Sequence, residues 1–368
     1  MKKVFFASII LCVALFASQD KKVSIKAVAI PLADHYAGIV AYEKYKNKMK
    51  HADYDLLLLP GPDLVRRHFR SFETTDIAFT VSPMVMDMFA KKPDFRWVSL
   101  IHRDGNALAV NKSLHQLMNL EQNTSQYMDH SKLARTIKKF KSTHSDPIEI
   151  AIPSPLATHT TILYKYLKDN NVSFSDGAKA ADVFLRIVKP PKSIAYLKKQ
   201  DVRGIPAAFE QSSPWPELLK VKQHGQIAWY SKDILQHPKG HVECVIIAKD
   251  RAIKQKHEAL GEVIYYIHKA GMDIEQARRE GGKKLDSIIT MVQKHIPSHT
   301  SEAIKQSLST DSMSINFQNL NVDTNAKESF HTIMDLAYEA GFIKTKIDID
   351  ALSNEDFRTQ ITQSNIHE

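Results

Sequence analysis

Four loops of the chain each follow a short apolar run and carry side chains that can bind a small molecule. The candidate ligand-binding residues of these loops are Asp34, His35, Tyr36, Ser82, Ser154, Thr158, His159, Glu210, Gln211 and Trp215. Their hydroxyl, amide, carboxyl, imidazole and indole groups suit hydrogen bonding to an enclosed solute. The turn at 102–106 adds Asn106 as a further ligand-binding candidate, with Arg103 beside it.

Each candidate also has a purely structural interpretation. Asp34 and Ser154 stand where a helix is expected to begin, and such residues often cap the helix. His35 and His159 could be packed or surface histidines. Trp215, which stands between two prolines, could be a buried anchor of its loop. The convergence of four loops favours a binding site over these separate interpretations.

A second set of residues suits a metal ion instead of an organic solute. Met84, Met86 and Met88, together with His241 and Cys244, are soft or borderline ligands for copper or zinc. A helix would place only Met84 and Met88 on one face. In a strand, His241 and Cys244 would point to opposite faces. A periplasmic metal-binding protein is therefore the alternative function, and we expect no cofactor and no bound metal.

The known catalytic motifs are missing from the sequence. It has no G-x-S-x-G, no H-E-x-x-H and no phosphate-binding loop. His257 and Glu258 begin the zinc-protease pattern, but Gly261 stands where the second histidine belongs. We therefore expect a binding protein and not an enzyme.

The elements that must position these residues alternate between short apolar runs and amphipathic stretches. This alternation predicts an α/β fold with mostly parallel sheets, and ligands of such sheets bind beyond the carboxyl ends of the strands. Two such blocks predict two lobes with a cleft between them: residues 21–106 begin lobe I and residues 107–240 form lobe II. Residues 241–368 are expected to return to lobe I with one strand and then helices, which include 252–269 and 274–295.

The first twenty residues have the layout of a secretory signal peptide. Lys2 and Lys3 precede an apolar run at 4–17, which is too short to span a bilayer, and cleavage is expected within 17–19. The alternative is an uncleaved anchor helix. Cys12 follows Leu11, which is too large for the usual lipid-attachment site. The expected location is the periplasm, where the one remaining cysteine, Cys244, cannot form an internal disulfide.

The chain is basic, with 50 Lys and Arg against 41 Asp and Glu, a formal net charge of +9. Such a balance mildly favours an anionic solute. The lysines are dispersed and do not alternate with aromatic residues in a stripe, so a nucleic-acid partner is not expected.

The order of several short motifs resembles the substrate-binding proteins of ABC transporters in the nitrate, sulfonate, taurine and bicarbonate group, which includes thiamine-precursor binders. The motifs are the first ligand loop at 34–38, the turn at 76–83, the crossover strands at 107–110 and 245–248, and the tail from 315–317 to 341–343. The resemblance implies a type II periplasmic-binding-protein fold with an interlobe cleft and a helical C-terminal region. It also implies a monomer that delivers a small solute to a membrane ABC permease. A ligand-binding partner of a membrane sensor is the remaining alternative.

Overall fold

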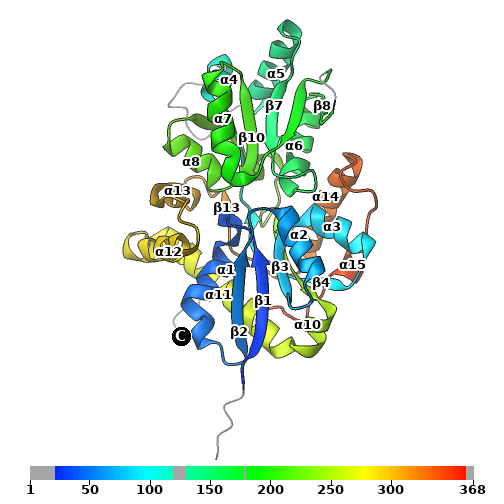
Figure 1. The fold of residues 1–368 in the computed structure, drawn as a ribbon, viewed down its shortest axis with the longest axis vertical. Coiled ribbons are helices and arrows are strands. Elements are labelled where there is room, and N and C mark those ends of the chain that lie inside the picture. Colours follow the sequence, from blue (N-terminus) through cyan, green and yellow to red (C-terminus); the bar gives the residue numbers. More distant parts are fainter. Residues whose placement is uncertain (1–20, 119–129, 178–179, 362–368) are drawn as a thin grey trace, which may run out of the picture.

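The computed structural model describes residues 21–118, 130–177 and 180–361. Each of the two lobes, one above the other in Figure 1, is built on its own sheet. The expected signal peptide at 1–20 lies outside the described residues. Within them, no helix is both long and apolar enough to cross a membrane.

Lobe I contains a five-stranded sheet in the order β2-β1-β3-β12-β4. Its strands are β1 (Val23–Ala29), β2 (Ala52–Leu58), β3 (Ile77–Val81), β4 (Phe95–Leu100) and β12 (Cys244–Lys249). Every residue of β3 and β12 is buried, as expected for central strands covered on both faces. The covering helices include α1 (Tyr36–Val40), α2 (Pro62–Ser71) and α3 (Ser82–Lys91). The first three strands run parallel, whereas β12 is antiparallel to β3 and β4.

Lobe II contains a six-stranded sheet in the order β11-β6-β10-β7-β9-β8. Its strands are β6 (Asn106–Asn111), β7 (Ile148–Ile152), β8 (Phe174–Ser175), β9 (Val183–Ile187), β10 (Ala207–Ser212) and β11 (Gly225–Tyr230). Its helices are α4 (Lys112–Met118), α5 (Ser131–Thr143), α6 (Thr158–Asp169), α7 (Ser193–Val202), α8 (Trp215–Val221) and α9 (Ser231–Ile234). Here β6 is the antiparallel strand, paired with β10 and β11.

Two chain segments cross between the lobes and are hydrogen-bonded to each other. The first crossing segment is residues 101–105, and the second is residues 235–243. The backbone N–H of Asp104 donates to the His241 carbonyl at 3.0 Å, and the His241 N–H donates to Asp104 Oδ1 at 2.9 Å. Gly240 has a φ of +84°, and a Cβ there would lie 2.4 Å from Asp104 Oδ2, so a glycine is required at this crossing. A short ladder of β5 (Arg103–Asp104) with β13 (Ile315–Asn316) braces the same region.

The C-terminal part is mostly helical and contacts both lobes. Its helices are α10 (Asp250–Gln255), α11 (His257–Glu280), α12 (Gly282–His295), α13 (Ser301–Ser307), α14 (Thr324–Glu339) and α15 (Ile349–Leu352). Helix α11 packs on α1 of lobe I, α13 packs on α8 of lobe II, and α14 contacts α3 and α6 (Figure 1). The assignment of all of 241–368 to lobe I stays a prediction, since this tail joins the two lobes.

The break between the two long C-terminal helices was expected at 270–273, and this is wrong. Helix α11 continues through Gly271 to Glu280, and the chain turns at Gly281 and Gly282, whose φ values are +65° and +53°. Gly271 serves close packing instead, because a Cβ there would lie 2.7 Å from the Phe317 carbonyl oxygen.

Candidate functional site

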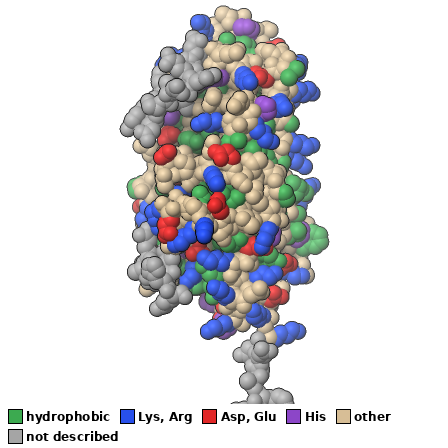
Figure 2. Space-filling view, turned by 90° about the vertical axis from the view of Figure 1, so that its left-hand side faces the viewer, with side chains coloured by type: hydrophobic (Ala, Val, Ile, Leu, Met, Phe, Trp, Pro, Cys, Tyr) green, Lys and Arg blue, Asp and Glu red, His purple; other side chains and the backbone are tan. Residues whose placement is uncertain are grey.

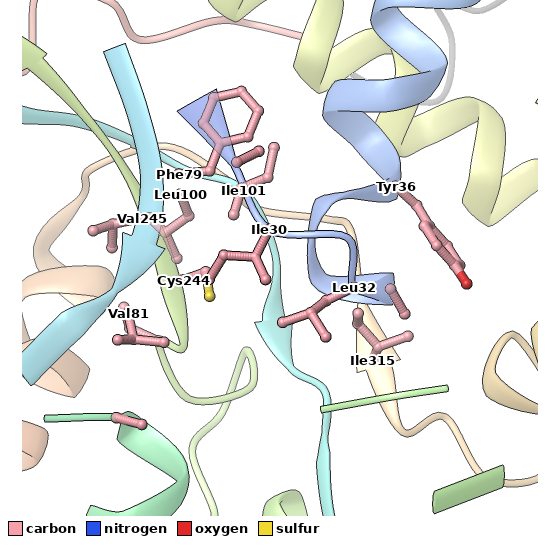
Figure 3. Packing of buried hydrophobic residues seen from close by; sticks show 14 of the residues in the cluster. Ile30, Leu32, Tyr36, Phe79, Val81, Leu100, Ile101, Cys244, Val245 and Ile315 are labelled. Carbon is pink, nitrogen blue, oxygen red and sulfur yellow. The ribbon is translucent and has the colours of Figure 1, made fainter. Parts of the chain in front are cut away.

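The central strands of lobe I bring three polar residues to one point at the lobe interface. Cys244 opens β12 directly opposite Val81, so Ser82 follows beside it, and the Cys244 carbonyl accepts the Ile101 N–H just before His102. Figure 3 shows Cys244 at this end of the core, in the packed group that includes Ile30, Val81 and Leu100. The side chains of Ser82, His102 and Cys244 are fully buried.

Asp34 stands at the centre of the contacts between the lobes. It lies in a single 3₁₀ turn after β1, and the neighbouring Ala33 N–H donates to the Ser213 carbonyl of lobe II at 2.9 Å. Ser212 Oγ donates to Asp34 Oδ2 at 2.6 Å. His159 Nε2 lies 2.6 Å from the same Ser212 oxygen, so a chain of hydrogen bonds runs from lobe II into Asp34.

Glu243, in the second crossing segment, makes the next set of interlobe contacts. His159 Nδ1 lies 3.2 Å from Glu243 Oε1. The Glu243 backbone carbonyl accepts from Ser82 Oγ of lobe I at 2.7 Å and from Thr158 Oγ1 of lobe II at 3.3 Å. Both lobes therefore converge on one residue of the crossing segment.

Strand β10 supplies the lobe II side of the site. Glu210 and Ser212 lie two residues apart and so share a face of the sheet, while Gln211 points the other way. Gln211 accordingly donates to the Val188 carbonyl at 3.1 Å. Asn106 pairs with Ser212 across the antiparallel ladder, and the side-chain polar atoms of Asn106 and Glu210 are buried without hydrogen-bond partners.

Two predicted aromatic residues meet at a third one that was not predicted. Tyr36 hydroxyl lies 2.8 Å from His299 Nδ1, and Trp215 packs edge-on against the same imidazole at a centroid distance of 5.2 Å. Trp215 opens helix α8, so it does not lie in an irregular loop. His299 lies just before α13, and this contact brings the C-terminal part against both lobes.

Two predicted residues have local contacts. His35 Nδ1 lies within 2.9 Å of the Ile30 backbone nitrogen and oxygen, and its ring packs edge-on against Phe79. Ser154 Oγ accepts the Leu156 N–H at 3.3 Å, which is a turn contact. The structure thus gives these two side chains a role in holding their loops.

The interlobe cluster is defined here as the buried polar residues that meet around Asp34. Its members are Asp34, His102, Asn106, His159, Glu210, Ser212, Glu243 and Cys244. Of these, His102, Ser212 and Glu243 were not among the predicted ligand-binding residues, and Cys244 was considered only for the metal-binding alternative, with His241 and the three methionines. The signal that could have found His102, Glu243 and Cys244 is their position beside the apolar runs at 97–101 and 245–248. Met84, Met86 and Met88 are instead packed in the hydrophobic core.

The electrostatics of the interlobe cluster follow from burial without counter-charge. Burial raises the pKa of Asp34 to about 8, and it raises the pKa of Glu210 and Glu243 well above the usual value. Burial also lowers the pKa of His159 to about 3 and that of His102 well below its usual value. Within the described residues, no Lys or Arg forms an ion pair with the three carboxyl groups. Near neutral pH the cluster without a ligand therefore holds protonated carboxyl groups, whose protons a cation could displace, beside neutral imidazoles.

Solved structures with the same fold include ligand-binding proteins from several bacteria. The nitrate-binding protein NrtA from Synechocystis PCC 6803 is 16% identical over 92% of this chain and 87% of that chain, with a TM-score of 0.72. A zinc-bound ligand-binding component of an ABC-type import system from Staphylococcus aureus is 16% identical over 92% and 98%, with a TM-score of 0.68. The alkanesulfonate-binding protein SsuA from Xanthomonas axonopodis pv. citri, bound to MOPS, is 10% identical over 90% and 97%, with a TM-score of 0.63. At these identities the likeness shows the fold.

The two lobes, each with its own sheet, give the chain the fold of the two-lobed periplasmic binding proteins. Residues 18–284 match the model of the NMT1-like family, which is more than half of the sequence, and the chain belongs to that family. Among the curated proteins, none matches this chain. The predicted fold class and the predicted resemblance to nitrate- and sulfonate-type binding proteins are confirmed.

Proposed function

We propose that this chain is the exported solute-binding component of an ABC import system. It acts as a monomer in the periplasm, closes its lobes over one small solute at the interlobe cluster, and delivers that solute to a membrane permease. The family match, the fold and the signal-like segment at 1–20 support this proposal. The observation that carries it is a set of buried polar groups, contributed by both lobes and left without partners.

The cost of these unpaired groups explains why a solute would bind. A buried polar atom without a hydrogen bond costs about 1–3 kcal/mol, and Asp34 Oδ1, both His102 ring nitrogens and both Glu210 oxygens are in that state. A solute that satisfies several of them at once gains affinity only when the lobes are closed. Closure and binding are thereby coupled, since the ligand shifts the population toward the closed state.

The side chains of the interlobe cluster favour a solute that carries positive charge or N–H donors. Carboxyl groups, imidazoles and a thiol accept protons or bind cations, and no described Lys or Arg side chain pairs with the carboxyls there. On the face drawn in Figure 2, lysines and arginines are interspersed with acidic residues. Arg103, beside His102, is buried but donates to the backbone carbonyls of Asn319 and Gly240 and, within the described part of the chain, forms no ion pair with the cluster.

The test is a ligand screen on the chain purified after export from a bacterial host. Melting temperature is measured against nitrate, bicarbonate, sulfonates, pyrimidines, amines and divalent metal salts. A ligand at 100 times its dissociation constant stabilises the folded state by about 2.7 kcal/mol. We expect one ligand to raise the melting temperature and also to reduce the radius of gyration measured by X-ray scattering. A ligand that raises the melting temperature without reducing the radius of gyration would contradict capture by lobe closure. So would a screen in which none of these solutes raises the melting temperature.

A further inference from the structure

We propose that the solute of the interlobe cluster is a divalent transition-metal ion of the zinc type, bound by Asp34, His102 and Cys244. This inference rests on the proposed function and names its substrate class. The three residues come from three separate segments of lobe I: the turn after β1, the first crossing segment and the start of β12. They offer carboxylate oxygen, imidazole nitrogen and thiolate sulfur, a donor set that suits zinc.

The distances between the donor atoms are those of one coordination shell. His102 Nε2 lies 3.7 Å from Asp34 Oδ2, and Cys244 Sγ lies 3.8 Å from the same oxygen. Bond lengths of about 2.0–2.3 Å at tetrahedral angles place zinc ligands roughly 3.3–3.7 Å apart. The donor atoms of the three residues all lie within 4.8 Å of one another. Small movements would therefore complete the shell.

The second observation is that the contact geometry leaves the imidazole unpaired. Both ring nitrogens of His102 are buried without a hydrogen-bond partner, and so is Asp34 Oδ1. A histidine kept only for packing would normally find at least one partner. His102 is fully buried, so bulk solvent does not reach its ring nitrogens.

Charge balance supports a dication over a neutral solute. One carboxylate and one thiolate around Zn²⁺, with a neutral imidazole, give a site of zero net charge, which a buried environment tolerates well. Without a cation, the side chains that donate to the Asp34 carboxyl group are the Ser212 hydroxyl and the distant Cys244 thiol. A metal would replace this poor compensation with direct bonds.

Lobe II supplies the outer shell and couples the metal to closure. Ser212 donates to Asp34 and is itself contacted by His159, whose other nitrogen faces Glu243. Asp34, His159 and Glu243 also form a second group whose donor atoms lie within 4.8 Å of one another. An ion held by lobe I alone would therefore attract lobe II residues as the lobes close. Outer-shell partners of this kind typically change metal affinity by about 10–100-fold.

The experiment measures metal binding by the chain after export, purification without a histidine tag and removal of metals with a chelator. Zn²⁺ is titrated calorimetrically, and Co²⁺ serves as a spectroscopic probe, because a thiolate ligand to cobalt produces a near-ultraviolet charge-transfer band. The variants are C244S and the isosteric D34N, each checked for folding by circular dichroism. The matched control is H331Q. His331 lies on α14, and its side chain is exposed to solvent and does not belong to the interlobe cluster.

We expect one Zn²⁺ per chain, a thiolate band with Co²⁺, and at least a tenfold loss of zinc affinity in C244S and D34N but not in H331Q. The C244S variant should also lose the band. Equal zinc affinity in all four proteins, or the absence of stoichiometric binding, would overturn the metal assignment. If an organic solute then compacts the chain in the scattering assay, solute capture stands and only the metal is wrong. If neither metal nor organic solute compacts it, the proposed function fails as well.

Discussion

Two fully buried aspartates of lobe I, Asp34 and Asp76, stand in opposite electrostatic surroundings. Asp76 receives Lys256 Nζ at 2.8 Å, Arg251 Nη1 at 3.1 Å and the Lys26 backbone N–H at 3.0 Å. Asp34 receives a serine hydroxyl, a distant thiol and a histidine at 3.7 Å, but no lysine or arginine among the described residues. One carboxyl group is compensated within the fold, and the other is not.

The buried histidines His268 and His102 repeat this contrast. His268 lies 2.7 Å from Ser99 Oγ and 2.5 Å from Thr359 Oγ1, so both ring nitrogens have partners. Both nitrogens of His102 lack them. Folded proteins pair nearly all buried polar groups, and the exceptions concentrate at functional sites. His268 is thus paired within the fold, whereas His102 is the histidine that the proposed metal would bind.

The largest effect is expected from Asp34→Asn. Because this carboxyl is not compensated by a cation, its replacement by an amide should leave the free energy of unfolding of the metal-free chain unchanged or higher. Zinc affinity should fall more than about 100-fold, about 2.7 kcal/mol. Calorimetric titration and urea unfolding measure the two quantities. If Asp34→Asn instead lowers the free energy of unfolding strongly and leaves zinc affinity unchanged, Asp34 stabilises the fold as Asp76 does.

Asp76→Asn should show the reverse pattern. Removing one partner of a buried ion pair costs about 3–5 kcal/mol, and the partial exposure of Lys256 and Arg251 reduces this to about 2 kcal/mol. The zinc dissociation constant should stay within about twofold. Urea unfolding of the variant measures the loss of stability, and calorimetric titration with Zn²⁺ measures the dissociation constant. If the variant binds zinc poorly while folding normally, Asp76 has a functional role that its contacts do not suggest.

The third expectation concerns pH and His268. Burial lowers the pKa of this imidazole to about 3, below its unfolded value, so the folded state holds it neutral. Its contribution to stability is present above pH 6.5 and is lost as the pH falls from 6.5 toward 3. His268→Gln should flatten the acid slope of the unfolding free energy by roughly 1.4 kcal/mol per pH unit in that range. Denaturant unfolding at several pH values measures this slope for both proteins. An equal slope in the variant and the unaltered chain would contradict the assigned role of His268.

The smallest effect is expected from Thr158→Val, which removes one interlobe hydrogen bond to the Glu243 carbonyl. That carbonyl keeps the Ser82 N–H and hydroxyl as donors, so the loss should be about 1 kcal/mol, or roughly fivefold in zinc affinity. Thr158→Ser retains the hydroxyl and should bind zinc like the unaltered chain. Equal affinity in the valine variant would show that this contact does not help to hold the lobes together.

Sequence patterns were sufficient for the lobes and for much of the lobe interface. The apolar runs at 77–81 and 148–152 coincide with β3 and β7, because central parallel strands are continuously apolar. The rule that ligand loops follow the carboxyl ends of strands brought Asp34 and His159 to one site. Strand β11 was not predicted, since its Gly225 start and mixed residues give no clear period.

The crossing segments show why other site residues could not be found in this way. His241 and Cys244 were placed on opposite faces of one strand, but β12 begins only at Cys244. His241 therefore follows no strand period, and its Nε2 lies 3.0 Å from Ser231 Oγ instead of joining the cluster. A residue in a crossing segment is oriented by contacts from both lobes, and local sequence carries no record of them.

The sequence by itself determined the α/β class, the division into two blocks and the loops that end at the interface, because these depend on local hydrophobic periodicity and on turn residues. Only the tertiary structure decided which side chains meet around Asp34 and which of them lack a partner. His102 is brought to Glu243 and Cys244 by the pairing of β4 with β12, which joins residues more than 100 positions apart. Whether a buried charge is compensated depends on such long-range neighbours, so it is a property of the fold and not of any motif.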